Sequence, residues 1–358
     1  MFNALSNPAI SHMSQSGTEV FETALSGLTD PVTVLVWAVL LDLLTRLLLP
    51  IARDRLSVLG GLPAGLARFF ENKLNRPYRS DRDLTTRGVL TVFILIIFAI
   101  ILGFGLDLLY HHHKHGGVIA VLYLFLTLGL SRPWPIGIRL IKILKGQSGR
   151  KVQQAAALFE RYNLNLHKHL HKPDIYAMSR IYLKEVALSF ERGLMVPAFW
   201  FAVPALFGSS GFVWSAVAVV LTEAARTTQT AEISGVFIRP LHLMNSVIRY
   251  IPSRIAALMI WLGAVFTPGG APLKSIATIV GQGHYHRFTA YGWPLAAVAG
   301  ALDVALSAGS DRSEWIGPQS GSAKVNRVDV RRALWLHVVT TLVSGLLFAM
   351  MVYLSIGL

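Results

Sequence analysis

The 358-residue sequence contains no cysteine, and charged residues make up only 15% of it. Without cysteine, the chain has neither a disulfide framework nor a thiolate metal site. Soluble domains carry about 25% charged residues, so the low charge content excludes an ordinary soluble domain. Hydrophobic residues account for 53% of the chain and indicate a protein whose helices lie in a membrane.

Several short motifs are also missing from the sequence. No phosphate-binding P-loop, no GxGxxG and no nucleophile elbow occurs, so a nucleotide-binding fold of the usual kind is not supported. The first 30 residues lack a basic start followed by an apolar core, which a signal peptide requires. We therefore expect residues 1–30 to form a polar tail before the first helix.

The sequence contains several apolar stretches, and some of them approach the roughly 17 to 25 residues that a membrane-spanning helix needs. Three long stretches cover 31–51, 89–110 and 333–358, and a shorter one covers 118–130. The stretch 194–221 is interrupted by Gly-Ser-Ser-Gly at 208–211, which favours a re-entrant hairpin or one kinked span. The expected fold is all-α: a polytopic integral membrane protein with about four to six membrane-embedded helical segments and amphipathic cytoplasmic helices.

The charge of +14 arises from 33 Lys and Arg against 19 Asp and Glu. The basic residues flank the apolar stretches instead of forming one solvent-facing module, so the positive-inside rule explains them better than a nucleic-acid partner. We expect a single membrane-embedded domain, 31–358, in a bacterial inner (cytoplasmic) membrane, with both termini on the outer face. Its basic excursions to the cytoplasm are expected at 52–88, 132–193, 222–254 and 271–332.

Asp42 stands about half-way along the first apolar stretch, with Arg46 four residues later on the same helical face. A charge at that depth is costly and ordinarily faces a protein interior or a wet cavity, with a partner nearby. Two interpretations remain open: an internal ion pair that fixes helix packing, or a role in a ligand site.

Three groups of histidines invite a metal-site interpretation, because imidazole is a common metal ligand. The groups are His111, His112, His113 and His115; His167, His169 and His171; and His284 with His286. None has an adjacent acid in a recognised metal-binding spacing. We therefore predict partly solvated histidines at the membrane boundary, and no metal site; a metal or solute carrier is the weakest of the functions considered.

Charged residues stand at both ends of the interrupted stretch 194–221. Glu185, Glu191 and Arg192 precede it, and Arg226 follows it together with Glu223. If the stretch folds as a hairpin, these groups meet at its cytoplasmic mouth. They would then form a phosphate site, since arginine offers a planar fork of donors, or a network of mutual salt bridges.

A series of short motifs, in order along the chain, resembles the CobD/CbiB family, the adenosylcobinamide-phosphate synthases of cobalamin biosynthesis. The matching elements are Leu41-Asp42-Leu43-Leu44, Asn75-Arg76, Arg87-Gly88, Tyr250-Ile251-Pro252-Ser253-Arg254, Gly292-Trp293-Pro294 and Ala299-Gly300-Ala301-Leu302. The resemblance covers most of the chain from Asp42 to Leu336. It implies the family's helical membrane fold.

The resemblance also implies a reaction, in which an amino alcohol or its phosphate is joined to a carboxyl group of the corrin ring with ATP and magnesium. Expected partners are membrane lipid and the corrinoid substrate. The candidate substrate-binding residues, from the motifs or from the charged hairpin ends, are Asp42, Asn75, Arg76, Arg87, Glu185, Arg192, Arg226, Tyr250, Arg254 and Trp293. No single catalytic residue is predicted.

The sequence departs from the family at polar positions. Ala187-Leu188-Ser189 stands where the family has Ala-Glu-Asn, and Arg192-Gly193 stands where it has Asp-Gly. A carboxylate replaced by an apolar side chain cannot bind magnesium in the same way. Two functions are therefore predicted as alternatives: the synthase, and a divergent, non-catalytic accessory or structural subunit that works with other membrane proteins.

Overall fold

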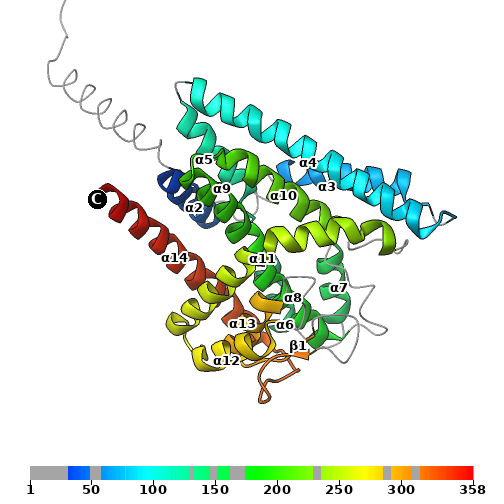
Figure 1. Cartoon of the computed structure of the whole chain (residues 1–358). Helices are drawn as coiled ribbons and strands as arrows, with labels where there is room; N and C mark the ends of the chain where they lie inside the picture. Colours follow the sequence, from blue (N-terminus) through cyan, green and yellow to red (C-terminus); the bar gives the residue numbers. More distant parts are fainter. Residues whose placement is uncertain are drawn as a thin grey trace, which may run out of the picture.

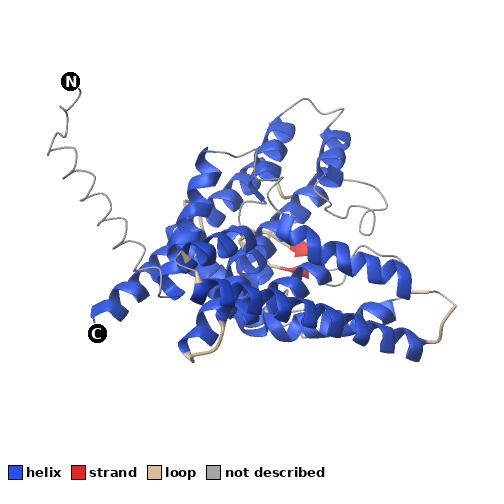
Figure 2. Cartoon of the chain, turned by 90° about the horizontal axis from the view of Figure 1, so that it is seen from above, coloured by secondary structure: helices blue, strands red, loops and turns tan. Residues whose placement is uncertain are grey.

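The computed structural model describes residues 31–48, 58–76, 78–113, 115–129, 133–145, 151–161, 174–228, 235–284, 292–307 and 315–357. These residues are almost entirely helical, as Figure 2 shows. The first helices are α2 (Pro31–Leu48), α3 (Val58–Leu74), α4 (Asp81–His112), α5 (Gly116–Thr127), α6 (Pro133–Lys145) and α7 (Lys151–Arg161). The all-α prediction is confirmed.

The second half of the chain continues the pattern. Its elements are α8 (Ile175–Phe190), the π-helical turn η4 (Glu191–Met195), α9 (Val196–Leu206), α10 (Gly211–Thr228), α11 (Gly235–Phe266), α12 (Pro272–Gln282), α13 (Gly292–Leu302), β1 (Leu306–Ser307), β2 (Trp315–Ile316) and α14 (Arg327–Gly357). The two strands pair antiparallel, with Leu306 opposite Ile316. Figure 1 shows this small hairpin beside α13, at the end of the bundle remote from α5.

Four helical segments in the described part of the chain are long and apolar enough to cross a membrane. They are Asp81–His112, Ile175–Pro204, Gly235–Phe266 and Arg327–Met350. The most apolar of them, α4, also has an outward face of large exposed apolar side chains, among them Phe93, Ile101 and Phe104. Such a face is stable against lipid and unfavourable in water, so these helices fit a multi-pass membrane protein.

The interrupted stretch 194–221 forms a helical hairpin. Its arms are α9 and α10, which pack against each other, and its turn contains Gly208 with a left-handed φ of 71°. The structure thus has the hairpin, one of the two forms expected from the sequence. Its first arm belongs to a longer helix, because α8 and the π-helical turn continue into α9 without a break and form one candidate span from Ile175 to Pro204.

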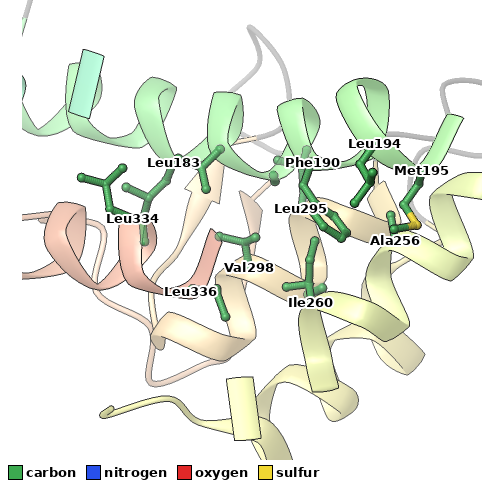
Figure 3. Close-up of a cluster of buried hydrophobic side chains, with 14 of the residues drawn as sticks. Leu183, Phe190, Leu194, Met195, Ala256, Ile260, Leu295, Val298, Leu334 and Leu336 are labelled. Carbon is green, nitrogen blue, oxygen red and sulfur yellow. The ribbon is translucent and has the colours of Figure 1, made fainter. Parts of the chain in front are cut away.

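Part of the larger hydrophobic core of the described residues lies where α8 and the π-helical turn meet α11, α13 and α14 (Figure 3). Figure 3 shows Leu183, Phe190, Leu194, Met195, Ala256, Ile260, Leu295, Val298, Leu334 and Leu336 converging there. α13 is central to this core because its small side chains let other backbones approach closely. A Cβ on Gly300 would stand only 2.5 Å from the Cα of Ser275 in α12.

α11 crosses the molecule and contacts both halves of it. Its first turn lies so close to α4 that the Phe237 carbonyl would clash with any side chain at Gly88. Its last turns pack on α14, where Gly263 lies against Thr340. Segments that the sequence assigned to cytoplasmic excursions thus fold as packed helices: α3 lies within 52–88, and the first part of α11 lies within 222–254.

A polar network fixes the connection that follows α13. Lys274 of α12 donates to Asp303 (2.5 Å), and Ser320 donates to the same carboxylate (2.9 Å). Gln282 exchanges two hydrogen bonds with the backbone of Gly317, at 2.9 and 2.8 Å. The Lys274 ammonium holds the pKa of the Asp303 carboxyl below its ordinary value of 3.8.

We predict that Gly103→Leu will destabilise the packing of α4 on α10. A Cβ at Gly103 would stand 2.5 Å from the Cα of Val213, whereas nothing lies within 4 Å of a Cβ at Gly105. Overpacking costs about 1–3 kcal/mol, so thermal unfolding in detergent should begin on the order of 5 °C lower. The matched control, Gly105→Leu, should unfold at the wild-type temperature; an equal effect of both changes would refute the assignment.

We predict a pH-dependent contribution from Asp303. Because its pKa is lower in the folded protein, the Lys274 contact stabilises the fold above pH 4 and is lost as the pH falls through the folded pKa. The carboxyl is partly exposed, so the effect should be about 1 kcal/mol or less. The melting-temperature difference between wild type and Asp303→Asn should therefore shrink below pH 4, and a constant difference would contradict the prediction.

Candidate functional site

A π-helical turn interrupts the long helix that contains α8 and α9. In this turn the N–H of Val196 donates to the carbonyl of Glu191, five residues back. Such turns are rare and are often found at functional sites. The wider turn leaves the Gly193 carbonyl available to a neighbouring helix, and the Gly129 N–H at the end of α5 donates to it at 3.0 Å.

The first residue of this turn, Glu191, forms an ion pair with Arg249 of α11. The pair is bidentate: the Arg249 Nε donates to Oε1 at 2.9 Å, and the Nη2 donates to Oε2. Both side chains have no exposed surface. Removing two charges from water costs several kcal/mol per ion, and the bidentate geometry is what offsets that cost.

The face of α11 that bears Arg249 carries further buried polar groups. Asn245 lies one turn before Arg249 and Ser253 one turn after it, and both are buried. The Asn245 Oδ1 is buried without a hydrogen-bond partner among the described residues. Buried polar atoms without a hydrogen-bond partner cost free energy. We call Asn245, Arg249 and Ser253, together with the paired Glu191, the polar centre of this otherwise apolar bundle.

A second charged group lies where α8 approaches the end of α10. Arg226 donates from its Nε to Glu223 at 2.7 Å, and the Glu185 carboxylate interacts electrostatically with the same guanidinium. Lys184 is attracted by the Glu185 carboxylate and repelled by the Arg192 guanidinium nearby. We call these five partly buried residues the Arg226 cluster. The folded hairpin thus brings charged groups from its two ends together; their role in binding stays a prediction.

The motif residues between α3 and α4 are placed differently. Asn75 is buried at the end of α3, and Arg76 beside it is exposed. Arg87 pairs with Asp83, four residues earlier in its own helix, with Nε and Oδ1 3.1 Å apart. Arg79 binds the same carboxylate at 2.9 Å. Among the described contacts, neither Arg76 nor Arg87 meets the Arg226 cluster.

Asp42 is fully buried in α2. Helix α2 packs mainly against α5, α14 and α9, whereas Arg226 lies on α10, which packs mainly against α4, α9 and α3. The side chain of Arg46, the partner expected from the sequence, lies outside the described residues. The sequence analysis expected Asp42 to face a protein interior or a wet cavity, and its side chain is fully buried. Its function stays a prediction.

The structure brings together three candidates that come from two separate motifs. The guanidinium carbon of Arg254 lies 3.6 Å from the ring centroid of Tyr250 and 4.6 Å from that of Trp293. A cation between two aromatic faces is held by both of them. This contact fastens the start of α13 to α11, which gives the Tyr-Ile-Pro-Ser-Arg and Gly-Trp-Pro motifs one shared structural role.

The described histidines do not gather into a metal site. No group of three His, Asp or Glu side chains in the described ranges could hold a metal ion. His111 lies 3.9 Å from Asp107 in its own helix, and His113 packs against His115. His167, His169, His171 and His286 lie outside the described residues.

The sequence did not single out Arg249 as a candidate. It did note Glu191, but only beside Arg192 at the start of the apolar stretch, without a partner. The available signal was periodic: Leu241, Asn245, Arg249 and Pro252 recur at helical spacing, and all four are buried. A basic residue on the buried face of such a helix requires a buried acid, but periodicity alone does not identify that acid.

Comparisons with known proteins bear directly on this arrangement. A family model described as "CobD/Cbib protein" matches residues 35–337. The chain belongs to the CobD/CbiB family. The resemblance found in the short motifs is thereby confirmed, and the matched range includes the ion pair, the Arg226 cluster and the Tyr250–Arg254–Trp293 contact.

Relatives of this CobD/CbiB-family chain carry one common name. This chain is 25% identical over 289 residues to "Cobalamin biosynthesis protein CobD" of Brucella anthropi, and the match covers 78% of this chain and 84% of that protein. It is 25% identical over 246 residues to the protein of the same name from a Sinorhizobium species, covering 67% and 71% of the two chains. No solved structure matches the chain.

We predict that breaking the buried ion pair on one side will be worse than removing it. Arg249→Met alone leaves the Glu191 carboxylate buried without its partner, at a cost of about 3–5 kcal/mol. Arg249→Met combined with Glu191→Leu should recover most of that loss, as measured by thermal unfolding of the purified protein in detergent. If the double variant is no more stable than the single one, the pair is not the source of the effect.

Proposed function

We propose that this chain acts in cobalamin biosynthesis at the membrane, by joining an amino alcohol, or its phosphate, to a carboxyl group of a corrinoid. The family match over residues 35–337 carries this proposal. The names of the relatives support it, since each is described as a cobalamin biosynthesis protein. The corrinoid substrate would reach the site from the end of the bundle that holds the Arg226 cluster.

The Arg226 cluster supports the reaction because it suits a phosphate with its metal ion. Magnesium is usually held by one or two carboxylates together with substrate phosphates. Glu185 and Glu223 are partly buried acids beside the same arginine, and they would hold magnesium. Arg226 and Arg192 would hold the phosphate oxygens. When bound, magnesium with ATP would supply the activation of the carboxyl group.

The charge distribution supports a placement in the bacterial inner membrane, as one domain from residue 31 to residue 358. Arg79, Arg82 and Arg87 gather at the start of α4, whereas the turn at its other end carries histidines. The Arg226 cluster would therefore face the cytoplasm, where ATP is found. Figure 1 shows α2 and the C-terminal end of α14 together on one side, away from α12 and α13.

A second candidate function is a non-catalytic subunit of a membrane complex. The ion pair favours it, because the most deeply buried acid of the polar centre, Glu191, is neutralised by an arginine of the same chain. The positions where the family carries polar groups hold Leu188 and Ser189 here, and both are buried. In this case the scaffold would be retained for assembly with other membrane proteins.

We predict that the chain restores cobalamin synthesis in a host that lacks its own synthase. Glu185→Gln and Arg226→Gln should each reduce cobalamin formation by about 10- to 100-fold, since charge-assisted contacts contribute about 1.5–3 kcal/mol. Asp81→Asn changes an exposed acid at the same end of the bundle and should leave synthesis unchanged.

One outcome would select the second candidate instead. If the wild-type chain is present in the membrane, fails to restore synthesis and purifies in fixed proportion with another membrane enzyme, the synthase proposal is lost. If synthesis is restored and Arg226→Gln has no effect, the reaction is retained but the Arg226 cluster is the wrong site.

A further inference from the structure

An apolar pocket of about 260 Å³ lies where α3, α4, α5 and α10 meet. Its walls include Leu62, Leu122, Tyr123, Thr127, Val219 and Val220. A cavity of roughly 150 Å³ in a protein core already binds a benzene molecule, so this one is large enough for part of a hydrocarbon chain.

The pocket offers no polar group that needs a ligand. The Tyr123 hydroxyl donates to Ser215 at 3.3 Å, and the Thr127 hydroxyl donates to the carbonyl of Leu124 at 2.9 Å. Two of its residues, Leu62 and Leu122, are 54% and 46% exposed, so the pocket reaches the surface of the bundle. Water would gain nothing in such a space, whereas an aliphatic chain would make close contacts with every wall.

The surface around the pocket faces lipid. α4 supplies one wall through Phe98, Leu102 and Leu106, and it is the most apolar of the candidate membrane spans. Phe104 of the same helix is an exposed apolar side chain outside the pocket. The hydrocarbon chains that adjoin such a surface are those of membrane lipids.

α10 connects this pocket to the Arg226 cluster. Ala216, Val219 and Val220 line the pocket, and Glu223 and Arg226 follow them on the same helical face. The seven residues from Val219 to Arg226 correspond to a rise of about 10 Å. One stripe of a single helix therefore presents an apolar wall and then a guanidinium, which is the polarity of a lipid acyl chain followed by its phosphate.

We propose that the pocket and Arg226 together bind one anionic phospholipid, with an acyl chain in the pocket and the phosphate at the guanidinium. The contact with Glu223 takes the Nε of Arg226, and a guanidinium has five N–H donors in all. Because a substrate phosphate would use the same arginine, the lipid would compete with it. The inference rests on the membrane placement and not on the proposed reaction, and its test measures lipid binding.

The experiment uses the purified full-length chain in detergent, stripped of lipid. Phosphatidylglycerol and phosphatidylcholine with identical acyl chains are titrated separately, and bound lipid is counted by native mass spectrometry. We expect one phosphatidylglycerol per chain, bound about tenfold more tightly than phosphatidylcholine. Val219→Phe should weaken the binding of both lipids at least tenfold, because the larger side chain fills the pocket.

Arg226→Gln tests the headgroup separately from the pocket. This variant should bind both lipids with the same affinity, no higher than that of the wild type for phosphatidylcholine, because both headgroups carry a phosphate. The control Phe104→Leu changes a lipid-facing side chain outside the pocket and should behave as wild type. Inorganic phosphate should abolish the preference for phosphatidylglycerol in the wild type while leaving phosphatidylcholine bound.

Two results would overturn the proposal. If Val219→Phe unfolds at the wild-type temperature and binds both lipids as the wild type does, no acyl chain occupies the pocket. If Arg226→Gln keeps the preference for phosphatidylglycerol, the phosphate does not lie at this arginine. Neither result depends on restored cobalamin synthesis, so failure of the lipid site is distinguishable from failure of the proposed reaction.

Discussion

The ion pair between Arg249 and Glu191 is the contact on which the arrangement of this bundle depends. It joins α11, which crosses the molecule, to the π-helical turn between α8 and α9. Neither charge has access to water, so each is tolerable only while the other is in place. This mutual requirement fixes the depth and the rotation of α11 relative to the long helix.

Other contacts of α11 are consistent with that position. The Trp200 Nε1 of α9 donates to the Ile248 carbonyl at 2.9 Å, one residue from Arg249. Further along the helix, the guanidinium of Arg254 is held between Tyr250 and Trp293. The two arginines therefore fasten different faces of α11: one to the π-helical turn and the other to α13. Glycines at both ends of the crossing allow α4 and α14 to approach it closely.

The distribution of polarity along α10 links the fold to the proposed functions. The helix lines an apolar pocket among lipid-facing spans and then ends in a charged cluster with α8. α4 has the same separation in the opposite chain direction, because its arginines are confined to its first turns and the apolar residues follow. A bilayer imposes this separation on every helix that leaves it, because charges are costly in hydrocarbon and stable at the headgroups.

The sequence by itself determined that the chain is helical, lies in a membrane and belongs to its family, because hydropathy and the order of short motifs are properties of local sequence. It also placed an interruption at residues 208–211 and left a hairpin and a kinked span as alternatives; the structure has the hairpin, with Gly208 in a left-handed turn. Only the tertiary structure decided which charges meet. Helical spacing identifies partners three or four residues apart, whereas Glu191 and Arg249 are 58 residues apart and are joined only by helix packing.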